Sequence, residues 1–229
     1  MRAGTLDRQS LLLAAIFPML AAGLLNEFWV EPAYRRGIGW FYVADAIQWI
    51  VVPGLVWLFV LRPGRIEPND YGLDFAPYAR RPLHAIALFL FVALLLWIAY
   101  EPVKSVALRF LGRYANTFGY ENIVPTSLLG KVVVVAYFSG TAALVEEVAF
   151  RGLPWAYLST AIPPAYRRFW YITLTSLLFA ATHAEQGPHG VIAAFTFGIM
   201  AAFLYTRLQN LWPLIFGHCV GDALSFWPT

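Results

Sequence analysis

Three charged side chains lie close together in an otherwise apolar stretch of the chain. They are Glu146, Glu147 and Arg151. Insertion scales assign a cost of roughly 3 kcal/mol to an ionised group at the centre of a bilayer. Such groups persist where they pair with each other, face a wet cavity or take part in chemistry. This triplet is therefore the first candidate for a functional site.

Helical spacing separates the roles of the two glutamates. Glu147 and Arg151 are four residues apart, so they share one helix face, with the acid before the base in the favourable order. Glu146 points about 100 degrees away at 3.6 residues per turn. We therefore expect Arg151 to neutralise Glu147 and to leave Glu146 as a carboxylate that can act as a general base. The alternative is a buried ion cluster that only fixes helix packing.

Two histidines lie in later apolar segments. His183 follows Phe179 by one helical turn, so ring and imidazole share a face. Taken alone, such a histidine is at least as often an interfacial or packing residue as a catalytic one. His218 and Asp222 are again four residues apart, and Asp222 could hold the imidazole in one tautomer and orientation. The alternative for this pair is a private hydrogen bond that stabilises the bundle.

The remaining histidines and the cysteine are interpreted as non-catalytic. His84 precedes a long apolar run and is expected at the membrane interface. Glu185 and His189 flank a Gly-Pro pair and are expected in a loop. Cys219 is the only cysteine, which excludes an internal disulfide and a cysteine-based metal cluster, and it is expected to be a small packing residue.

The composition indicates that membrane helices position these groups. Of 229 residues, 60% are hydrophobic and 13% are charged, against about 25% charged in soluble domains. Crossing the hydrocarbon core takes about 20 apolar residues in a helix. We therefore expect an all-α, polytopic membrane helical bundle that forms a single membrane domain over residues 1–229. The candidate spans are residues 9–27, 40–61, 83–101, 127–148, 152–162, 169–184, 190–207 and 211–227.

These spans predict about eight transmembrane helices, or seven if the short segment 152–162 only dips into the membrane. If 152–162 instead carries the chain back across, Glu146 and His183 end near the same face. Residues 62–82 and 102–126 are expected as polar connections, and part of the second is expected to form an interfacial helix. The first span is expected to stay uncleaved, although its pattern resembles a signal peptide.

The order and spacing of the charged motifs resemble those of the CAAX-processing endopeptidase and bacteriocin-processing (CPBP, or Abi) family. The motifs are Glu146-Glu147-x-x-x-Arg151, Phe179-x-x-x-His183 and His218-x-x-x-Asp222. The resemblance covers a protease core at about residues 127–225 and leaves the N-terminal spans, residues 1–126, unaccounted for. It implies an α-helical intramembrane protease whose catalytic cavity opens to one aqueous face.

The resemblance also implies roles for the individual residues. Glu146 and His183 would activate a water for attack on the scissile carbonyl, and His218 with the residue four later would stabilise the oxyanion. The family often has asparagine at the position of Asp222. An ionised aspartate cannot donate a hydrogen bond to an oxyanion, so we expect Asp222 to orient His218 or to act in its protonated form.

Three residues are expected to support this site, namely Glu147, Arg151 and Phe179. The expected reaction is cleavage of a membrane-associated protein or peptide near its C-terminus, without a cofactor or metal. The resemblance names a prenylated CAAX protein, a sorting-signal tail or a bacteriocin precursor as substrate. The expected partners are the lipid bilayer and this membrane-tethered substrate. The basic residues are scattered and the net charge is only +3, so the sequence predicts no basic patch that would bind nucleic acid.

Three alternatives remain beside this hypothesis. The same four side chains (Glu146, His183, His218 and Asp222) could bind zinc in a metalloprotease, although the sequence has no HExxH pair and no dense ligand spacing. An ion- or proton-coupled transporter would also keep buried charges, but the chain has no repeated half. A catalytically inactive scaffold is the third alternative, but such a protein would have little need for buried charged residues. The compact chain indicates a multi-pass protein of a prokaryotic plasma or inner membrane.

Overall fold

The computed structural model describes residues 7–112 and 123–227, and all regular structure within these ranges is helical. The predicted all-α class is therefore confirmed. The helices, in chain order, are α1 (Arg8–Leu24), α2 (Asn26–Arg36), α3 (Ile38–Ala46), η1 (Ile47–Val51), α4 (Val52–Val56), η2 (Trp57–Leu61), η3 (Pro68–Tyr71), α5 (Ala76–Ala79), α6 (Pro82–Leu111), α7 (Leu128–Glu147), η5 (Val148–Gly152), α8 (Leu153–Ala161), α9 (Pro164–Ala181), η6 (Ala184–Gln186), α10 (Gly187–Leu208) and α11 (Trp212–Phe226). Of the short elements, η1, η2 and η5 are π-helical turns, and η3 and η6 are 3-10 turns.

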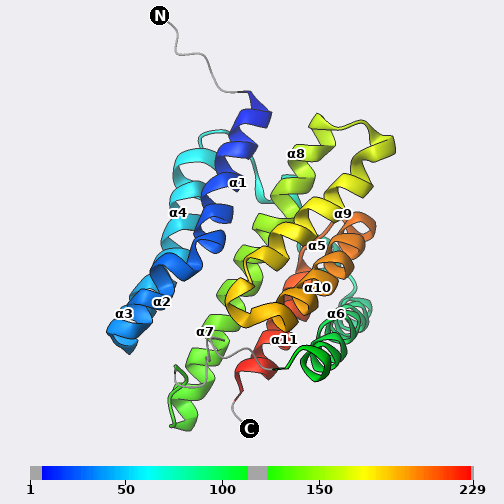
Figure 1. The fold of residues 1–229 in the computed structure, drawn as a ribbon. Coiled ribbons are helices and arrows are strands. Elements are labelled where there is room, and N and C mark those ends of the chain that lie inside the picture. Colours follow the sequence, from blue (N-terminus) through cyan, green and yellow to red (C-terminus); the bar gives the residue numbers. More distant parts are fainter. Residues whose placement is uncertain (1–6, 113–122, 228–229) are drawn as a thin grey trace, which may run out of the picture.

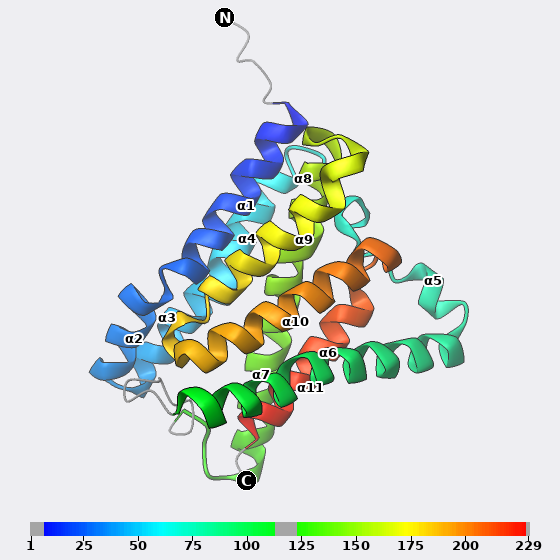
Figure 2. The ribbon, with the colours of Figure 1, turned by 45° about the vertical axis from the view of Figure 1, so that its right-hand side comes forward.

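A single helix of 34 residues, Leu128–Ala161, runs through the middle of the molecule and comprises α7, η5 and α8. The helices α1 to α4 lie on one side of it, where α1 packs on α8 and η1 packs on α7 (Figure 1). On the other side, α11 packs on α7, and α10 lies between α9 and α6 (Figure 2). The central helix therefore contacts both halves of the bundle.

The prediction of a separate short segment at 152–162 was wrong, because these residues continue the central helix. Pro154 lacks the N–H that an α-helix needs in its interior. It is the second residue after the π-helical turn η5, where the hydrogen-bond ladder is already shifted by one residue. The Tyr171 hydroxyl also donates to the Arg151 carbonyl oxygen at 3.2 Å. The helix therefore passes through Pro154 without ending.

The chain returns toward the middle of the bundle through α9 instead. A short connection at residues 162–163 follows α8, and α9 packs back along α8 and η5 (Figure 1). His183 comes at the end of α9, so this return brings it to the level of Glu146. Glu146 and His183, which the sequence places near the same face, both line one cavity, although α9 rather than residues 152–162 carries the chain back.

The third predicted span is longer than expected. The sequence predicts a helix over 83–101 and a polar connection over 102–126, whereas α6 continues through Pro102 to Leu111. Within residues 102–111, Ala107 is buried, whereas Val106 and Phe110 are exposed. One face of this part of the helix therefore packs on the protein, and apolar side chains cover the opposite face. Residues 113–122 of that predicted connection lie outside the described residues.

Four helical segments in the described ranges are long and apolar enough to cross a membrane. They are Ile38–Leu61, Pro82–Leu111, Leu128–Ala161 and Ala184–Leu208. The pair α1 and α2, bent by 46°, makes a fifth if it forms one broken span. The predicted count of about eight is not confirmed.

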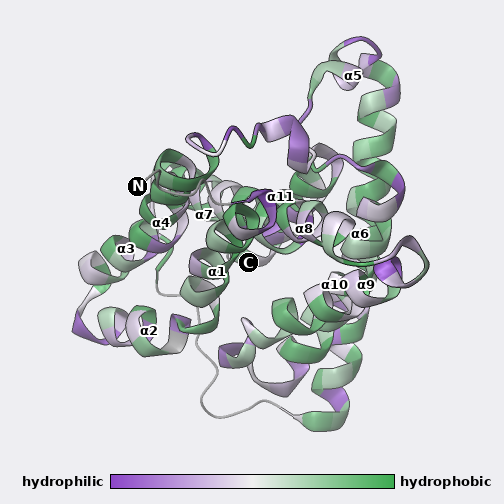
Figure 3. Ribbon diagram, turned by 90° about the horizontal axis from the view of Figure 1, so that it is seen from above, coloured by the Kyte–Doolittle hydropathy of each residue, from purple (hydrophilic) through white to green (hydrophobic). Residues whose placement is uncertain are grey.

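The outer faces of these helices are strongly apolar. Phe59 on η2 and Leu83 and Phe110 on α6 are 69%, 78% and 85% exposed. Figure 3 shows hydrophobic residues along α4 and α6. Such large exposed apolar faces are suited to lipid rather than to water. The protein is an integral membrane protein.

The connection between η2 and α6 is tied to the middle of the bundle. Gly152 leaves no room for a side chain, because a Cβ atom there would lie 2.4 Å from the Tyr71 carbonyl oxygen. The same carbonyl accepts a hydrogen bond from the Tyr205 hydroxyl at 3.1 Å. The Leu211 amide donates to the Gly72 carbonyl at 2.8 Å. These contacts hold the connection against the turn that carries Arg151.

Candidate active site

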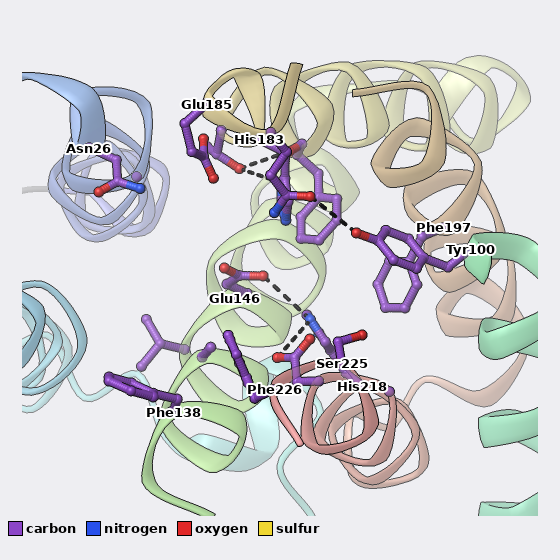
Figure 4. A pocket seen from close by; sticks show the side chains of 18 of the residues that line it. Asn26, Tyr100, Phe138, Glu146, His183, Glu185, Phe197, His218, Ser225 and Phe226 are labelled. Carbon is purple, nitrogen blue, oxygen red and sulfur yellow. Dashed lines mark hydrogen bonds and ion pairs between the residues drawn. The ribbon is translucent and has the colours of Figure 1, made fainter. Parts of the chain in front are cut away.

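A cavity of about 490 Å³ lies between the two halves of the bundle. It is lined by Glu146 from α7, His183 from the end of α9, and His218 and Asp222 from α11. Figure 4 shows Glu146, His183 and His218 extending toward the same space. The structure therefore brings together all four residues that the sequence analysis predicted to be catalytic. They come from three helices that are distant in sequence.

The two adjacent glutamates differ in what they face. The Glu146 side chain lines the cavity, and its Oε2 atom lies 3.6 Å from His218 Nε2. Glu147 has no exposed surface and does not line the cavity. Its Oε1 atom lies 3.3 Å from Arg151 Nη1, which is the ion pair predicted from their spacing. The division between a cavity-facing and a buried carboxylate agrees with the helical geometry.

Glu147 has a second partner that the spacing did not indicate. Its Oε1 atom also lies 2.8 Å from His218 Nδ1, which is a buried hydrogen bond between α7 and α11. Because a carboxylate oxygen accepts, Nδ1 carries the hydrogen. Nε2 is then the ring nitrogen that faces the cavity. Glu147 thus orients the His218 imidazole. The sequence had suggested Asp222 for this role.

Arg151 is almost fully buried behind the cavity and is surrounded by aromatic rings. Its guanidinium carbon lies 4.3 Å from the centroid of Phe179, 5.6 Å from that of Phe197 and 5.9 Å from that of Phe150. A guanidinium at such distances from ring faces gains cation–π attraction, which is stronger where water is excluded. Burial of this charge is therefore offset by one carboxylate and by three rings.

His183 is held by the helix end that carries it. Its Nδ1 atom lies 2.8 Å from the Phe179 carbonyl oxygen and 3.2 Å from the Thr182 hydroxyl oxygen. A carbonyl oxygen only accepts, so Nδ1 carries the hydrogen and Nε2 keeps a lone pair. The ring centroids of His183 and Phe179 are 4.6 Å apart. Phe179 therefore contacts both His183 and Arg151, as expected of a supporting residue.

Asp222 lies on the cavity side of His218. Its Oδ2 atom is 3.6 Å from His218 Nε2, the same distance as Glu146 Oε2. Its side chain is 27% exposed, against 11% for Glu146. Two carboxylates therefore flank one ring nitrogen. Among the described residues, no three or more His, Cys, Asp or Glu side chains converge in the manner of metal ligands.

The central and C-terminal part of the chain matches a known protein family. Residues 127–224 match the type II CAAX prenyl endopeptidase family described as Rce1-like. These residues form an Rce1-like domain. The family consists of CAAX-type proteases that hydrolyse peptide bonds, so the resemblance inferred from three motifs is confirmed. No curated protein and no solved structure matches the chain.

Several residues of the cavity wall were not anticipated. Phe197 of the Rce1-like domain lies 4.8 Å from the ring centroid of His218. Tyr100 of α6 donates a hydrogen bond to Gln186 Oε1 at 3.1 Å above the same space (Figure 4). Asp45 and Gln48 line the wall from α3 and η1. Asp45 is an ionisable residue inside an apolar run, so the argument applied to Glu146 could have found it.

His189 is the one histidine whose predicted surroundings were wrong. It was expected in a loop, but α10 begins at Gly187, so His189 lies in the first turn of that helix. It is 8% exposed and lines the cavity. Pro188 explains the difference, since proline fits the first turn of a helix as well as it fits a loop. The Gly-Pro pair marks a helix start here.

Proposed function

We propose that the protein is an intramembrane endopeptidase of the CAAX type that cleaves a membrane-associated protein or peptide near its C-terminus. Glu146 and His183 activate the attacking water. The observation that carries this proposal is the meeting of Glu146, His183, His218 and Asp222 on one cavity wall within an Rce1-like domain. A site of this kind brings a general base and a hydrogen-bond donor to the same buried space.

The first step uses the two groups that can accept a proton or hydrogen bond. A water between Glu146 and the His183 Nε2 lone pair gives a proton to the Glu146 carboxylate. Its oxygen attacks the carbonyl carbon of the scissile bond. The His183 tautomer supports this arrangement, because Nδ1–H is committed to the Phe179 carbonyl. His183 thus orients the water while Glu146 takes its proton.

The second step needs a donor for the negative charge that forms on the carbonyl oxygen. His218 Nε2 faces the cavity, and in the imidazolium form it carries a hydrogen to donate. Glu147 supports that form, because its carboxylate accepts from Nδ1 within the protein. When the C–N bond breaks, the proton held by Glu146 passes to the leaving amine. The base of the first step acts as the acid of the second.

Asp222 is proposed to complete the orientation of His218 from the cavity side. An ionised Asp222 at 3.6 Å holds Nε2–H toward the cavity, and a protonated one could itself donate to the oxyanion. Arg151 and Phe179 are positioning residues. They act through Glu147 and His183 rather than on the substrate.

The proposed membrane arrangement starts from the four candidate spans and the bent pair of α1 and α2. We propose that seven segments are embedded in the membrane. Five of them are α1–α2, α3–η2, α6, α7–α8 and α10, and the other two are α9 and α11. The bundle then has seven embedded segments, which is the lower of the two predicted counts. A prokaryotic plasma or inner membrane is proposed as the location of the protein. The bilayer and a membrane-tethered peptide are its partners.

The decisive experiment measures cleavage of lipid-anchored candidate peptides by the purified protein in detergent or nanodiscs. It compares the protein with Glu146→Ala and His183→Ala, each with and without a strong chelator. We expect cleavage that survives the chelator and is lost in both variants. Unchanged cleavage in both variants would overturn the site. Loss with the chelator and recovery on addition of zinc would favour the metalloprotease alternative, and proton-coupled uptake without cleavage would favour the transporter.

A further inference from the structure

Two polar side chains lie on the wall of the cavity that the N-terminal helices supply. Asp45 is the second-last residue of α3, and Gln48 lies in the π-helical turn η1, three residues later on the same face. Both line the cavity, and they are only 6% and 4% exposed. Both lie outside residues 127–224, so the Rce1-like domain alone does not contain them.

Each of these side chains has an oxygen without a hydrogen-bond partner. The two atoms are Asp45 Oδ2 and Gln48 Oε1. Within the described ranges, no ion pair joins Asp45 to a basic residue. Leaving a buried acceptor unpaired costs the full desolvation of that group, and for a carboxylate the cost is larger still. A donor that enters the cavity would remove this cost.

The charge of the cavity wall favours a cationic donor over a neutral one. Among the residues that the structure describes, the wall holds five carboxylates and one lysine, Lys104, besides three histidines. Lys104 is itself near Glu101, at 4.0 Å. A low-dielectric cavity lined mainly by one sign of charge concentrates ligands of the opposite sign. Asp45, whose Oδ2 atom has no hydrogen-bond partner although Tyr137 and Trp49 lie beside the carboxylate, is the one carboxylate of this wall that belongs to α3.

The position of Asp45 along the central helix sets its distance from the reacting groups. Tyr137 of α7 lies beside Asp45 and precedes Glu146 by nine residues, or about 14 Å at 1.5 Å per residue. Between these levels the wall follows one face of α7 through Phe138 and Ala142. An extended peptide covers about 14 Å with roughly four residues.

We propose that Asp45, assisted by Gln48, is a specificity site that binds a basic side chain of the substrate about four residues from the scissile bond. The inference deepens the proposed protease function and rests on it. The Asp45 carboxylate accepts from the ammonium or guanidinium group, and the Gln48 amide oxygen accepts a second hydrogen. Asp45 touches substrate at a distance from the chemistry, so it selects the peptide without taking part in bond cleavage.

The test uses lipid-anchored synthetic peptides in which one lysine replaces norleucine at successive positions. Cleaved bonds are identified by mass spectrometry. Binding of the same fluorescent peptides is measured by polarisation in the Glu146→Gln background, so a readout exists without turnover. We expect a lysine preference of about tenfold at one position, roughly four residues from the cleaved bond. Asp45→Asn, which keeps the size of the side chain, should reduce the preference to near unity.

Glu101→Gln is the matched control, because it removes one carboxylate from the same cavity wall. This variant should weaken the binding of all lysine peptides by the same factor and leave the preferred lysine position unchanged. Gln48→Met should lower the preference by less than Asp45→Asn. A positional preference that persists in Asp45→Asn, in binding and in cleavage, would overturn the specificity site. Cleavage that persists in Glu146→Ala would instead overturn the proposed function, so the two failures are distinguishable.

A packing role for Asp45 makes a different prediction. If Asp45 only joins α3 to α7, Asp45→Asn lowers the thermal unfolding temperature in detergent and reduces cleavage of lysine and norleucine peptides by the same factor. The specificity site requires a change in their ratio. Circular dichroism and gel filtration of the variant show whether the bundle is intact.

Discussion

His218 Nδ1 lies 2.8 Å from Glu147 Oε1, so the imidazole on α11 is fixed by the buried carboxylate on α7. The same oxygen lies 3.3 Å from Arg151 Nη1. One carboxylate oxygen therefore contacts both the histidine proposed to stabilise the oxyanion and a buried arginine. This sharing makes the stability of the bundle and the orientation of His218 depend on a single side chain, and the two effects can be separated by substitution.

Glu147→Gln should damage both properties at once. Arg151 would lose its ion partner while buried, which costs about 3–5 kcal/mol, and His218 would lose the carboxylate that orients it. We expect a large fall in thermal unfolding temperature and a fall in kcat of about 10²-fold or more. The double variant Glu147→Gln/Arg151→Met removes the stranded charge. Its stability should largely recover while kcat stays low, and joint recovery would refute the role assigned to Glu147.

Glu146→Gln should remove the general base while leaving the bundle intact. The amide keeps the size of the side chain, but it cannot take a proton from water. We expect a fall in kcat of about 10²–10⁴-fold with little change in unfolding temperature. Glu31→Gln on α2 is the matched control, since Glu31 forms an ion pair with Arg35 away from the cavity. Equal activity loss in both variants would argue against a specific role for Glu146.

His183→Ala should abolish the orientation of the attacking water. His183 is half-buried, follows the end of α9 and lines the cavity, so its removal opens space there. We expect a fall in kcat of at least about 10²-fold. His84→Ala, at an exposed position near the start of α6, should keep full activity. Single-turnover cleavage in nanodiscs measures both, and an active His183→Ala protein would exclude this residue from the chemistry.

Two glycines of the central helix should respond in opposite ways to alanine. At Gly152 a Cβ would lie 2.4 Å from the Tyr71 carbonyl oxygen, whereas at Gly140 it would meet no atom within 4 Å. Gly152→Ala should therefore destabilise the protein by about 1–3 kcal/mol. Gly140→Ala should be neutral or stabilising by up to about 1 kcal/mol, because alanine is the better helix former. Thermal unfolding in one detergent compares them directly.

The helical class and the grouping of the site followed from the sequence for physical reasons. Charged residues inside apolar runs are rare because they are costly, so Glu146 and Arg151 were visible without a structure. The four-residue spacing also predicted the pair of Glu147 and Arg151. Such local regularities depend only on helix geometry, and the chain obeys them.

The parts that escaped prediction depend on contacts between distant segments. The hydrogen bond of Glu147 to His218 joins residues 71 positions apart, and neither motif encodes it alone. The continuous helix through Pro154 depends on a π-helical turn and on Tyr171 from another helix. His189 was misplaced because proline marks helix starts and loops equally well. In each case a tertiary partner decided between two locally acceptable conformations.

The position of the central helix between the two halves of the bundle has a consequence for how the enzyme is delimited. Of the 34 residues that line the cavity, 15 precede residue 127. The Rce1-like domain therefore forms only part of the cavity wall, and the N-terminal helices form the rest. A fragment cut to residues 127–224 would keep the four proposed catalytic side chains but would lose one wall of the cavity. The limits of the family match, residues 127–224, are therefore not the limits of the enzyme, which also includes the N-terminal helices that line the cavity.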